Sequence, residues 1–391
     1  MVKLAYVTTY DVLNSQNWPK HQVGLCGAGY YLAKNLQEPS ISIDYINYFS
    51  HKFKVITRAK WSFYRYLFKK DYYRWSEPLV LQDYAQQISH KLSNLNSDIV
   101  LCPENAVPIS YLECKQPIVL WTDSTLAALI NNYPWLSNLC NETLKNIYTL
   151  EKAALDRCKL IIYWSDWAAE TAIKNYGITA SKVKVVPAGA NIECDRTLDD
   201  IRQIVDARSP FVCKLLFFGV EWIRKGGDIA LEVAKELNKI GIKTELTIIG
   251  CQPISNEPLP SFVKPLGFIS KSTKEGENKI NQLLAESHFL ILPSQAECYG
   301  IVFCEANSFG VPCLATNVGG IPTIIKHNLN GKIFSSDAKI SEYCDYIASL
   351  MANYSEYKRL ALSSFNEYQS RLNWSVAGQT FKQILTELIF A

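Results

Sequence analysis

Short runs of consecutive apolar residues alternate with longer segments of helical periodicity along the whole chain. In the first half, the apolar runs predict strands at 3–10, 42–49, 98–103, 117–123, 159–165 and 182–189. Helices are expected between them, for example at 27–38, 82–94 and 141–157. The strand segments lack the strict alternation of apolar and polar residues that marks a half-exposed strand. The pattern therefore predicts a parallel sheet that helices bury on both faces.

The same pattern begins again in the second half of the chain. Strands are predicted at 213–219, 244–250, 288–294 and 312–320, with helices at 227–241, 279–287 and 301–310. The polar stretch 197–210 is expected to be a linker, and 373–391 is predicted to be an amphipathic helix with no strand after it. The predicted fold class is therefore α/β, with two doubly wound, Rossmann-like domains that face a cleft. Ligands in such folds bind outside the carboxyl ends of the strands, so residues that directly follow strands are the most informative.

Composition and charge narrow the class further. Of the 391 residues, 48% are hydrophobic and 20% are charged, which is ordinary for a soluble globular protein. A net charge of +3 is too small to indicate nucleic-acid binding. The 12 cysteines form no CxxC pair and mostly lie in apolar runs, so reduced, buried thiols are expected rather than a metal site. The N-terminus does not resemble a signal peptide, and no stretch approaches the ~20 apolar residues of a membrane span. A cytoplasmic protein is therefore expected, either free or at the inner face of a membrane.

A basic turn follows the first predicted strand of the second half. The segment FFGVEWIRKGGD (217–228) ends the strand at Gly219 and then brings Arg224 and Lys225 to the start of a helix. Two cations and flexible glycines at a helix N-terminus suit a diphosphate, because the helix dipole and free N–H groups add to the side-chain charge. A solvated basic turn is the alternative interpretation of the same residues.

A second candidate follows a buried strand further along. The segment ECYGIVFCEA (297–306) places Glu297 in a loop and Glu305 about one turn into the next helix, with Gly300 between them. Backbone N–H groups from 299 to 302 would face an anion such as a phosphate. Each carboxylate can accept hydrogen bonds from two vicinal hydroxyls, as a sugar or a ribose offers. Surface charge is the alternative, but the neighbouring residues are apolar, so carboxylates there need partners.

These segments resemble the donor domain of retaining glycosyltransferases of the GT-B fold, in the large family numbered four. The family pattern is a strand-ending glycine followed by Lys-Gly, then Pro-Ser, then two glutamates eight residues apart, then Gly-Gly-Ile-Pro. The chain matches this pattern with Gly219, Lys225-Gly226, Pro293-Ser294, Glu297, Glu305 and Gly319-Gly320-Ile321-Pro322. Order, spacing and strand context agree over about residues 213–335. The first half is similar more loosely, through GAGYYLAKNL, YWSDWAAETAI and VVPAGANI.

The resemblance implies a role for each part of the chain. Residues 1–205 would form an acceptor-binding domain, and 206–370 would form the domain that binds the nucleotide sugar. Residues 371–391 would form a C-terminal helix that returns to the first domain. The nucleotide base would meet mostly backbone groups near 266–270, so the side chains do not identify the base.

The resemblance also implies roles for single residues. Glu305 would bind the ribose hydroxyls, Glu297 the hydroxyls of the donor sugar, and Arg224 with Lys225 the departing diphosphate. Gly27, in the first strand–helix loop, would let the backbone approach that diphosphate. The implied catalytic residues are Arg224, Lys225, Glu297 and Asp123. The implied donor-binding residues are Gly27, Gly219, Glu297, Cys298, Tyr299, Gly300, Ile301, Val302 and Glu305.

Three positions depart from the family pattern. Val220 stands where the family often has arginine, and Arg224 would supply that charge instead. Thr323 stands where a glutamate often follows Gly-Gly-Ile-Pro. Many members carry a histidine at the end of the strand predicted at 117–123, where this chain has Asp123. Asp123 would either position a sugar or cap the next helix.

The predicted function is a retaining, metal-independent transfer of a sugar from a nucleotide diphosphate sugar, most simply a UDP- or GDP-sugar. The acceptor would be a hydroxyl of a glycan, a glycolipid or a small molecule. No cofactor is expected, because the two cations stabilise the leaving group and no Asp-x-Asp metal motif is present. A catalytically inactive nucleotide-sugar-binding partner of another transferase is the alternative. The chain lacks residues that an epimerase, a phosphorylase or an NAD-dependent oxidoreductase would require.

The segment 51–78 stands apart in composition. It holds eight lysines and arginines, two acidic residues and nine aromatic residues. Three interpretations remain open: a helix on a membrane surface, an acceptor site with aromatic rings stacked on sugars, or a helix that packs its aromatic stripe on the core. A peripheral membrane contact through this segment is therefore one expectation, and no nucleic-acid partner is expected.

Overall fold

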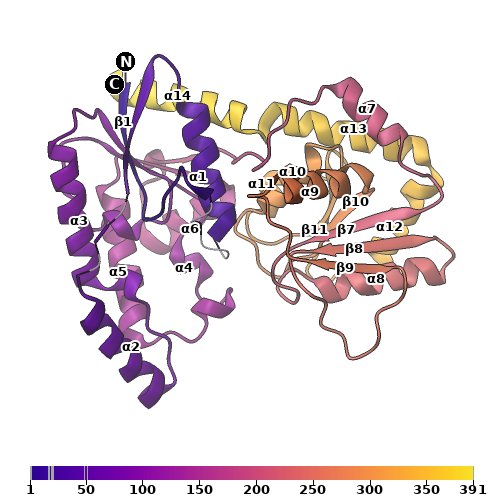
Figure 1. The fold of residues 1–391 in the computed structure, drawn as a ribbon, viewed down its shortest axis with the longest axis horizontal. Coiled ribbons are helices and arrows are strands. Elements are labelled where there is room, and N and C mark those ends of the chain that lie inside the picture. Colours follow the sequence, from indigo (N-terminus) through magenta and orange to yellow (C-terminus); the bar gives the residue numbers. More distant parts are fainter. Residues whose placement is uncertain (1, 16–17, 19–21, 48, 51, 391) are drawn as a thin grey trace. The chain divides into compact units, whose positions relative to one another are not determined.

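The computed structural model describes residues 2–15, 18, 22–47, 49–50 and 52–390 (Figure 1). Contacts between residues divide the chain into two compact units, Met1–Pro187 with Gly378–Ala391, and Ala188–Ala377. Each unit has its own sheet and its own core. Two ends of predicted segments, His51 and Ala391, lie outside the described residues.

The first unit is built on a six-stranded parallel sheet with the order β2-β1-β3-β4-β5-β6. Its strands are β1 (Val2–Val7), β2 (Ile41–Ile46), β3 (Ile99–Cys102), β4 (Ile118–Thr122), β5 (Leu160–Tyr163) and β6 (Val183–Val185). Its helices are α1 (Val23–Leu36), α2 (Lys54–Phe68), α3 (Pro78–Ser93), α4 (Leu126–Leu129), α5 (Asn141–Arg157) and α6 (Asp166–Tyr176). One buried cluster joins side chains of β1, β3, β4 and β5 to α3, α5 and α6.

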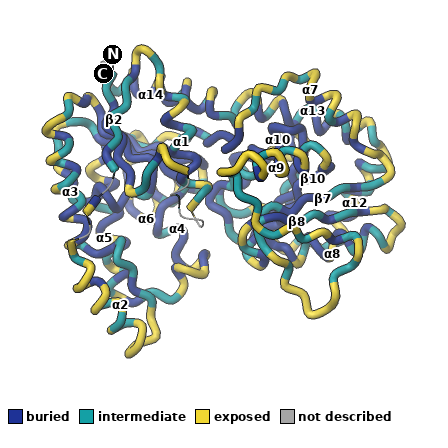
Figure 2. The backbone as a smooth tube through the Cα atoms, viewed as in Figure 1, coloured by how far each residue is buried: buried dark blue, intermediate teal, exposed yellow. Residues whose placement is uncertain are grey.

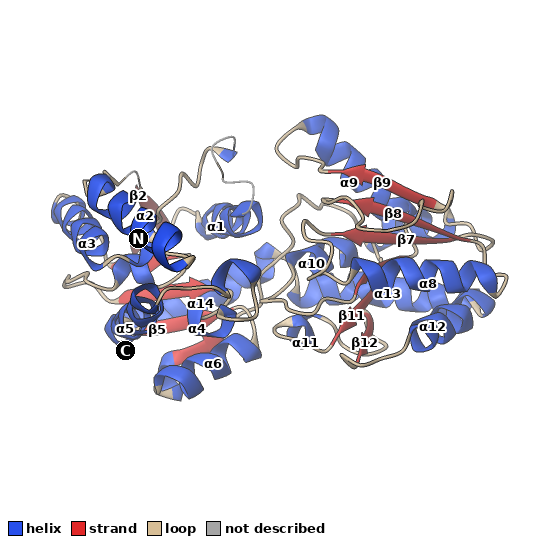
Figure 3. Ribbon diagram, turned by 90° about the horizontal axis from the view of Figure 1, so that it is seen from below, coloured by secondary structure: helices blue, strands red, loops and turns tan. Residues whose placement is uncertain are grey.

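The second unit repeats the design, with the strand order β12-β11-β10-β7-β8-β9. Its strands, all parallel, are β7 (Cys213–Phe218), β8 (Thr244–Ile249), β9 (Val263–Gly267), β10 (Phe289–Leu292), β11 (Cys313–Thr316) and β12 (Gly331–Phe334). Its helices are α7 (Leu198–Asp206), α8 (Gly227–Lys239), α9 (Lys274–Glu286), α10 (Ile301–Asn307), α11 (Ile321–Ile324), α12 (Ile340–Ala352), α13 (Tyr354–Arg371) and the start of α14 (Trp374–Phe390). Figures 1 and 3 show α8 and α12 on one face of this sheet and α9 and α10 on the other.

The central strands are buried on both faces. Every residue of β3, β4, β5, β10 and β11 is buried, and Figure 2 shows these strands as dark tube inside each unit. Such strands need apolar side chains on both sides, which explains the continuous apolar runs in the sequence. The predicted doubly wound α/β fold is therefore confirmed.

The expected linker at 197–210 is wrong, because most of it forms helix α7. Thr197 caps this helix: its hydroxyl accepts a hydrogen bond from Asp200 N, and the Asp200 carboxylate accepts one from Thr197 N. Ile201 and Val205, four residues apart, are buried on one side of the helix. The two apolar residues are flanked by charged ones, so the stretch has a polar composition although it folds as an element of the second unit.

Two strands and one helix start also differ from the sequence pattern. β9 is half exposed and contains Pro265, and β12 is a four-residue edge strand after an Asn-Gly turn, so neither forms a continuous apolar run. α1 begins at Val23, four residues before the predicted start at 27.

The last helix belongs to both units. The residues of α14 from Gly378 onward group with the first unit. There, a Cβ on Gly378 would lie 3.0 Å from the Asn35 carbonyl oxygen, so glycine permits a close approach to the end of α1. Lys382 donates to Glu38 over 2.5 Å in the same region. The assignment of acceptor-binding and donor-binding domains to 1–205, 206–370 and 371–391 stays a prediction.

Candidate functional site

Three loops meet at one edge of the second sheet. They follow β7, β10 and β11, which are neighbours in the sheet and run parallel, so their carboxyl ends lie side by side. Gln295 N donates to Arg224 O over 2.7 Å, which joins the loop after β10 to the loop after β7. Gly320 N donates to Glu297 O over 3.2 Å, which joins it to the loop after β11. The three motifs that the sequence analysis selected therefore form one continuous cluster.

Two glycines make this close approach possible. Gly226 has a φ of +73°, and a Cβ there would lie 2.1 Å from the Pro293 carbonyl oxygen. Gly319 has a φ of +53°, and a Cβ there would lie 1.7 Å from the Glu297 carbonyl oxygen. Both positions combine a left-handed backbone with a contact that leaves no space for a side chain. The Lys-Gly and Gly-Gly motifs thus have a local structural cause.

Lys225 and Glu297 form an ion pair inside the cluster. Their relative exposures are 8% and 9%, and Lys225 Nζ donates to Glu297 Oε2. Arg224 is held by Glu221, through Nε to Oε2 at 3.0 Å and Nη2 to Oε1 at 2.7 Å, and its Nη1 donates to Ala296 O over 2.8 Å. The hydrogen bond from Arg224 is the main cause of a lowered pKa of the Glu221 carboxyl. Both predicted phosphate-binding cations are therefore fixed in place by a carboxylate.

Glu305 is the most deeply buried acidic side chain of this cluster. It lies in α10 with 1% of its surface exposed, and its Oε1 accepts a hydrogen bond from Lys271 Nζ. Its Oε2 is buried and has no hydrogen-bond partner among the described residues. A buried carboxylate oxygen without a partner is costly, so the position calls for hydrogen-bond donors from a ligand.

Lys271 is a site residue that the sequence pattern did not predict. It follows the segment 266–270 that was expected to lie near the nucleotide base, and its ammonium lies 5.1 Å from the centre of the Phe218 ring. Its pairing with Glu305 joins the loop after β9 to α10, which are far apart in sequence. A lysine four residues after a strand that ends in glycine was the available signal, and this pattern is too common to identify a site.

The loop before α10 offers its backbone rather than its side chains. Gly300 has a φ of +96° and forms the left-handed N-cap of the helix. The Tyr299 side chain is buried, its hydroxyl donates to Ala188 O over 2.7 Å, and burial raises the pKa of this phenol. Cys298 is also buried, and Ile301 and Val302 are half-buried. Any contact of Tyr299 with a ligand would therefore use its amide.

The two predicted residues of the first unit differ from expectation in detail. Gly27 lies inside α1 and not in the loop before it, because the helix starts at Val23. Asp123 directly follows β4 and accepts a hydrogen bond from Ser124 Oγ over 3.2 Å. The cap of helix α4 is Thr125, whose side chain accepts from Ala128 N over 3.3 Å. The interpretation of Asp123 as a helix cap is therefore wrong.

The first unit also holds two buried carboxyl groups that the sequence analysis missed. Glu104 follows β3 and accepts hydrogen bonds from Thr9 N at 3.1 Å and Thr9 Oγ1 at 3.0 Å, and burial raises its pKa to about 8. Glu151 of α5 accepts from Leu126 N and from the Tyr176 hydroxyl, and burial raises its pKa to about 7. Glu104 shares the carboxyl edge of the first sheet with Asp123. An acid in the sequence CPEN, directly after a strand, was the signal for it.

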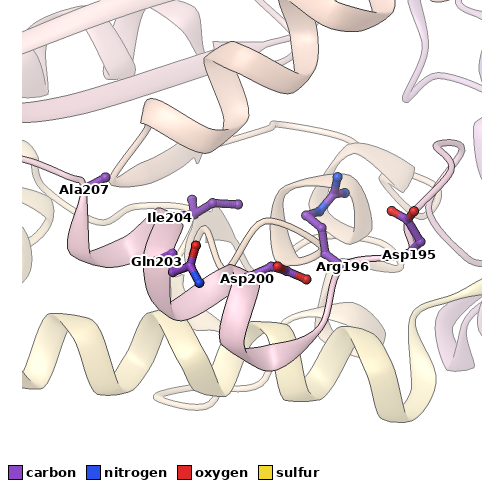
Figure 4. A pocket seen from close by; sticks show the side chains of 6 residues that line it. All are labelled: Asp195, Arg196, Asp200, Gln203, Ile204 and Ala207. Atoms are coloured by element: carbon purple, nitrogen blue, oxygen red, sulfur yellow. The ribbon is translucent and has the colours of Figure 1, made fainter.

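A separate pocket of about 580 Å³ lies beside α7 (Figure 4). Its lining residues are Asp195, Arg196, Asp200, Gln203, Ile204 and Ala207. Figure 4 shows them on α7, on the segment just before it and, for Ala207, directly after it. No predicted site residue lines this pocket. In the part of the chain that the structure describes, no group of three or more His, Cys, Asp or Glu side chains could hold a metal ion.

Two six-stranded parallel sheets, each covered by helices, with glycine-rich loops at the strand ends, define the GT-B class of two-domain glycosyltransferase folds. A glycosyltransferase from Rickettsia africae superposes over 99% of this chain and 98% of its own, with a TM-score of 0.65 and 15% identity. The Anabaena protein Alr3699/HepE, solved in complex with UDP-glucose, covers 99% of this chain and 100% of its own, with a TM-score of 0.61 and 16% identity.

A match to a known family lies in the second unit. Residues 214–364 match the family described as glycosyl transferases group 1. A curated relative, the D-inositol 3-phosphate glycosyltransferase of Corynebacterium jeikeium, is 23% identical over 284 residues. That match covers 68% of this chain and 66% of the relative, so the chain spans just under two thirds of the relative's length.

Proposed function

We propose that the chain transfers a sugar from a nucleotide diphosphate sugar to an acceptor hydroxyl, and that the cluster around Glu305 binds the donor. The observation that carries this proposal is the buried Glu305 Oε2, which lacks a hydrogen-bond partner among the described residues. The ribose of a nucleotide offers two adjacent hydroxyl donors, which would satisfy this oxygen. The match of residues 214–364 to the group 1 family and the UDP-glucose bound by Alr3699/HepE support the same choice of ligand, and UDP- and GDP-sugars are the proposed donors.

The surrounding side chains would then divide the rest of the donor between them. Lys225 and Arg224 lie beside Glu297 at the ends of β7 and β10, where a diphosphate would compete with the carboxylates for the two cations. Once released by Lys225, Glu297 would accept hydrogen bonds from hydroxyls of the donor sugar. Backbone groups of the loop 298–302 would contact the phosphate and sugar oxygens.

The proposed chemistry is a retaining transfer without a metal ion. The acceptor hydroxyl would attack the sugar on the face that the diphosphate leaves, and a diphosphate oxygen would take its proton. Arg224 and Lys225 would stabilise the negative charge that develops on the leaving group, a role that is typically worth 10²–10³-fold in kcat per preorganised donor. The first unit, with Asp123, is proposed to bind the acceptor, which is a carbohydrate or a lipid-linked sugar, and Gly27 stays a predicted donor-binding residue.

A cytoplasmic location at a membrane surface is also proposed, with contact through the segment 51–78. No helix among the described residues is long and apolar enough to cross a bilayer. The support for a surface contact comes instead from α2, which exposes both apolar and basic side chains.

The experiment that tests the activity is release of nucleotide from radiolabelled UDP- and GDP-sugars, with panels of glycans and lipid-linked sugars as acceptors. Wild-type protein is expected to release nucleotide only when an acceptor is present, and equally well with EDTA. Lys225→Ala should be at least about a hundredfold slower. Glu232→Ala, a change at an exposed ion pair of α8, is the matched control and should keep the wild-type rate. Binding of donor without turnover for any acceptor would contradict the proposed transfer, and inhibition by EDTA would contradict its metal independence.

A further inference from the structure

Helix α2 contacts the protein through polar groups and exposes large apolar side chains to solvent. Thr57 is its one buried residue among those described. The inward contacts are ionic: Lys60 Nζ donates to Glu77 at 2.9 Å and to Glu142 at 2.6 Å, and the Tyr64 hydroxyl donates to Glu142 at 2.9 Å. An ordinary surface helix buries its apolar face and exposes its charges. α2 instead exposes large apolar side chains together with basic ones.

The exposed side of α2 is rich in large apolar side chains. Figure 2 draws α2 mostly in the colours of exposed and half-exposed residues. The exposed apolar residues of the helix are Val55, Ile56, Trp61, Phe63, Tyr66, Leu67 and Phe68, with relative exposures from 45% to 82%. Contiguous exposed apolar surface of this kind marks an interaction site. The aromatic residues that recur at helical spacing in the segment are Trp61, Tyr64, Phe68, Tyr72 and Trp75. The interpretation as a helix that packs this stripe on the core is wrong for Trp61 and Phe68, which are exposed. Tyr72 is buried but follows the helix, and Tyr64 and Trp75 are half-buried.

A pocket of about 250 Å³ opens at the N-terminal half of the same helix. It is lined by Lys54, Thr57, Arg58, Trp61, Tyr72 and Arg74. Arg74 belongs to the short 3₁₀ helix Arg74–Ser76, and its Nε and Nη2 are buried without a hydrogen-bond partner among the described residues. Buried guanidinium nitrogens are normally paired, so a ligand with acceptor oxygens fits here.

The charge of the pocket is uncompensated. None of Lys54, Arg58 and Arg74 has a described ion-pair partner, whereas Lys60 and Arg65 on the same helix are both paired with carboxylates. Three cations around a cavity favour an anion with several oxygens, and an arginine fork matches a phosphate group geometrically. The chemistry that the pocket recognises is therefore that of a phosphate ester.

We propose that this pocket binds the phosphate of an anionic phospholipid headgroup, while the exposed apolar side chains of α2 enter the lipid beside it. Trp61 joins the two parts, because it lines the pocket and is 45% exposed. A phospholipid surface offers a phosphate and hydrocarbon within the same few ångströms, and tryptophan favours that boundary. A soluble phosphate would leave the apolar side of α2 in water, and a protein partner would leave the phosphate-type pocket unexplained.

The test is flotation of the full chain with two kinds of vesicle. One kind is phosphatidylcholine alone, and the other also contains about 30% phosphatidic acid or phosphatidylglycerol. Two double variants carry the same loss of charge, within α2 or at its C-terminal end. Lys54→Gln with Arg58→Gln removes pocket cations, and Arg65→Gln with Lys69→Gln removes cations outside it. All four side chains are exposed, so both variants should fold. Arg74→Gln is the third variant.

Wild-type protein is expected to float with anionic vesicles and not with phosphatidylcholine alone. The pocket double variant and Arg74→Gln should lose about tenfold more affinity than the control double variant, which measures non-specific attraction. Equal losses in the two double variants would overturn the pocket. If inorganic phosphate stabilises the wild type but not Arg74→Gln, and the wild type binds no vesicle, the pocket binds free phosphate and the lipid headgroup is overturned as its ligand.

This inference deepens the membrane contact proposed above and does not depend on donor chemistry. Stabilisation of each variant by a nucleotide sugar keeps the two proposals apart. A variant that fails to float but still responds to the donor as the wild type does would have a defect in α2 alone. If the wild type binds no nucleotide sugar, the vesicle result still tests the headgroup pocket. Failure of the wild type to bind any anionic vesicle would overturn both the headgroup pocket and the membrane contact.

Discussion

At the scale of single residues, the pair Lys225–Glu297 connects stability to the proposed chemistry. Each partner is more than nine-tenths buried, so removal of one leaves an uncompensated buried charge. Breaking such a pair costs about 3–5 kcal/mol, whereas replacing both charges together is often close to neutral. The two residues can therefore be tested for a structural role and a functional role separately.

We predict that Lys225→Met and Glu297→Gln each lower the free energy of unfolding by about 3–5 kcal/mol, and that the double variant recovers most of the loss. Every variant that lacks Lys225 should bind the donor poorly, because the diphosphate has lost a cation. Urea denaturation and donor titration of the four proteins measure both effects. Recovery of donor binding along with stability in the double variant would show that Lys225 only supports the fold.

Single residues also show where sequence reasoning succeeds and stops. Glu297, Glu305 and Lys225 were selected because carboxylates and cations follow strands at fixed spacings. Lys271 and Glu221 were missed, because their role depends on contacts that the order of strands in the sheet creates. Glu104 was missed for a different reason: a lone acid after a strand carries no motif until its burial is known.

At the scale of elements, the junction of the loops after β10 and β11 depends on Gly319. We predict that Gly319→Ala displaces the loop of Glu297, because a Cβ would lie 1.7 Å from the backbone carbonyl oxygen of Glu297. The variant should lose donor binding as well as stability. Gly241→Ala is the matched control, because Gly241 also has a positive φ, of +90°, but nothing within 4 Å of the added Cβ.

The control should cost only the strain of a left-handed alanine, about 1–2 kcal/mol, and should leave donor affinity intact. Thermal unfolding and donor titration of the two variants provide the comparison. If both variants lose the same stability and both keep full donor affinity, the close approach at Gly319 does not shape the site.

Elements with continuous apolar runs were predictable, and elements at the edges were not. The buried strands β3, β4, β5, β10 and β11 each correspond to an apolar run, because helices cover both faces. Helix α7 was taken for a linker, since two apolar residues four apart carry little weight among charged neighbours. β9 and β12 lie at or near sheet edges, where half-exposed residues, a proline and a Gly turn hide the strand.

At the scale of the whole molecule, two buried carboxyl groups link stability to pH. The pKa of Glu104 is raised from 4.5 to about 8 and that of Glu151 from 4.5 to about 7, in both cases mainly by burial. Between the unfolded and folded pKa values the folded state holds a proton that the unfolded state releases. The unfolded state therefore binds fewer protons in this window, and stability falls as pH rises.

We predict that these groups make the free energy of unfolding decrease from about pH 4.5 to about pH 8 and level off above that. Glu104→Gln should reduce the decrease, because glutamine does not titrate. Urea denaturation midpoints measured at intervals of about one pH unit, from about pH 5 to about pH 8, give the slope of stability against pH. Glu170→Gln, at an exposed pair on α6, is the control and should run parallel to the wild type. Parallel curves for all three proteins would contradict the assignment.

The two-unit architecture itself was predictable from the restart of the apolar pattern after residue 210. The grouping of the last residues of α14 with the first unit was expected from the family resemblance and not from the residues themselves, because the pattern of an amphipathic helix does not identify the sheet that it covers. The close approach at Gly378 and the ion pair of Lys382 with Glu38 supply that information only in three dimensions.

The most direct test of the central claim is thermal stabilisation of wild type and Glu305→Ala by a panel of UDP-, GDP- and ADP-sugars. A donor at a hundred times its Kd should stabilise the wild type by about 2.7 kcal/mol. Loss of the charged acceptor should weaken binding by about 1.5–3 kcal/mol, so the shift should fall to about half or less in Glu305→Ala. It should persist in full in Glu257→Ala, a control change at an exposed side chain. The predicted result is that one class of nucleotide sugar stabilises the wild type and the control, and stabilises Glu305→Ala much less. No stabilisation by any sugar nucleotide, or equal stabilisation of Glu305→Ala, would contradict it.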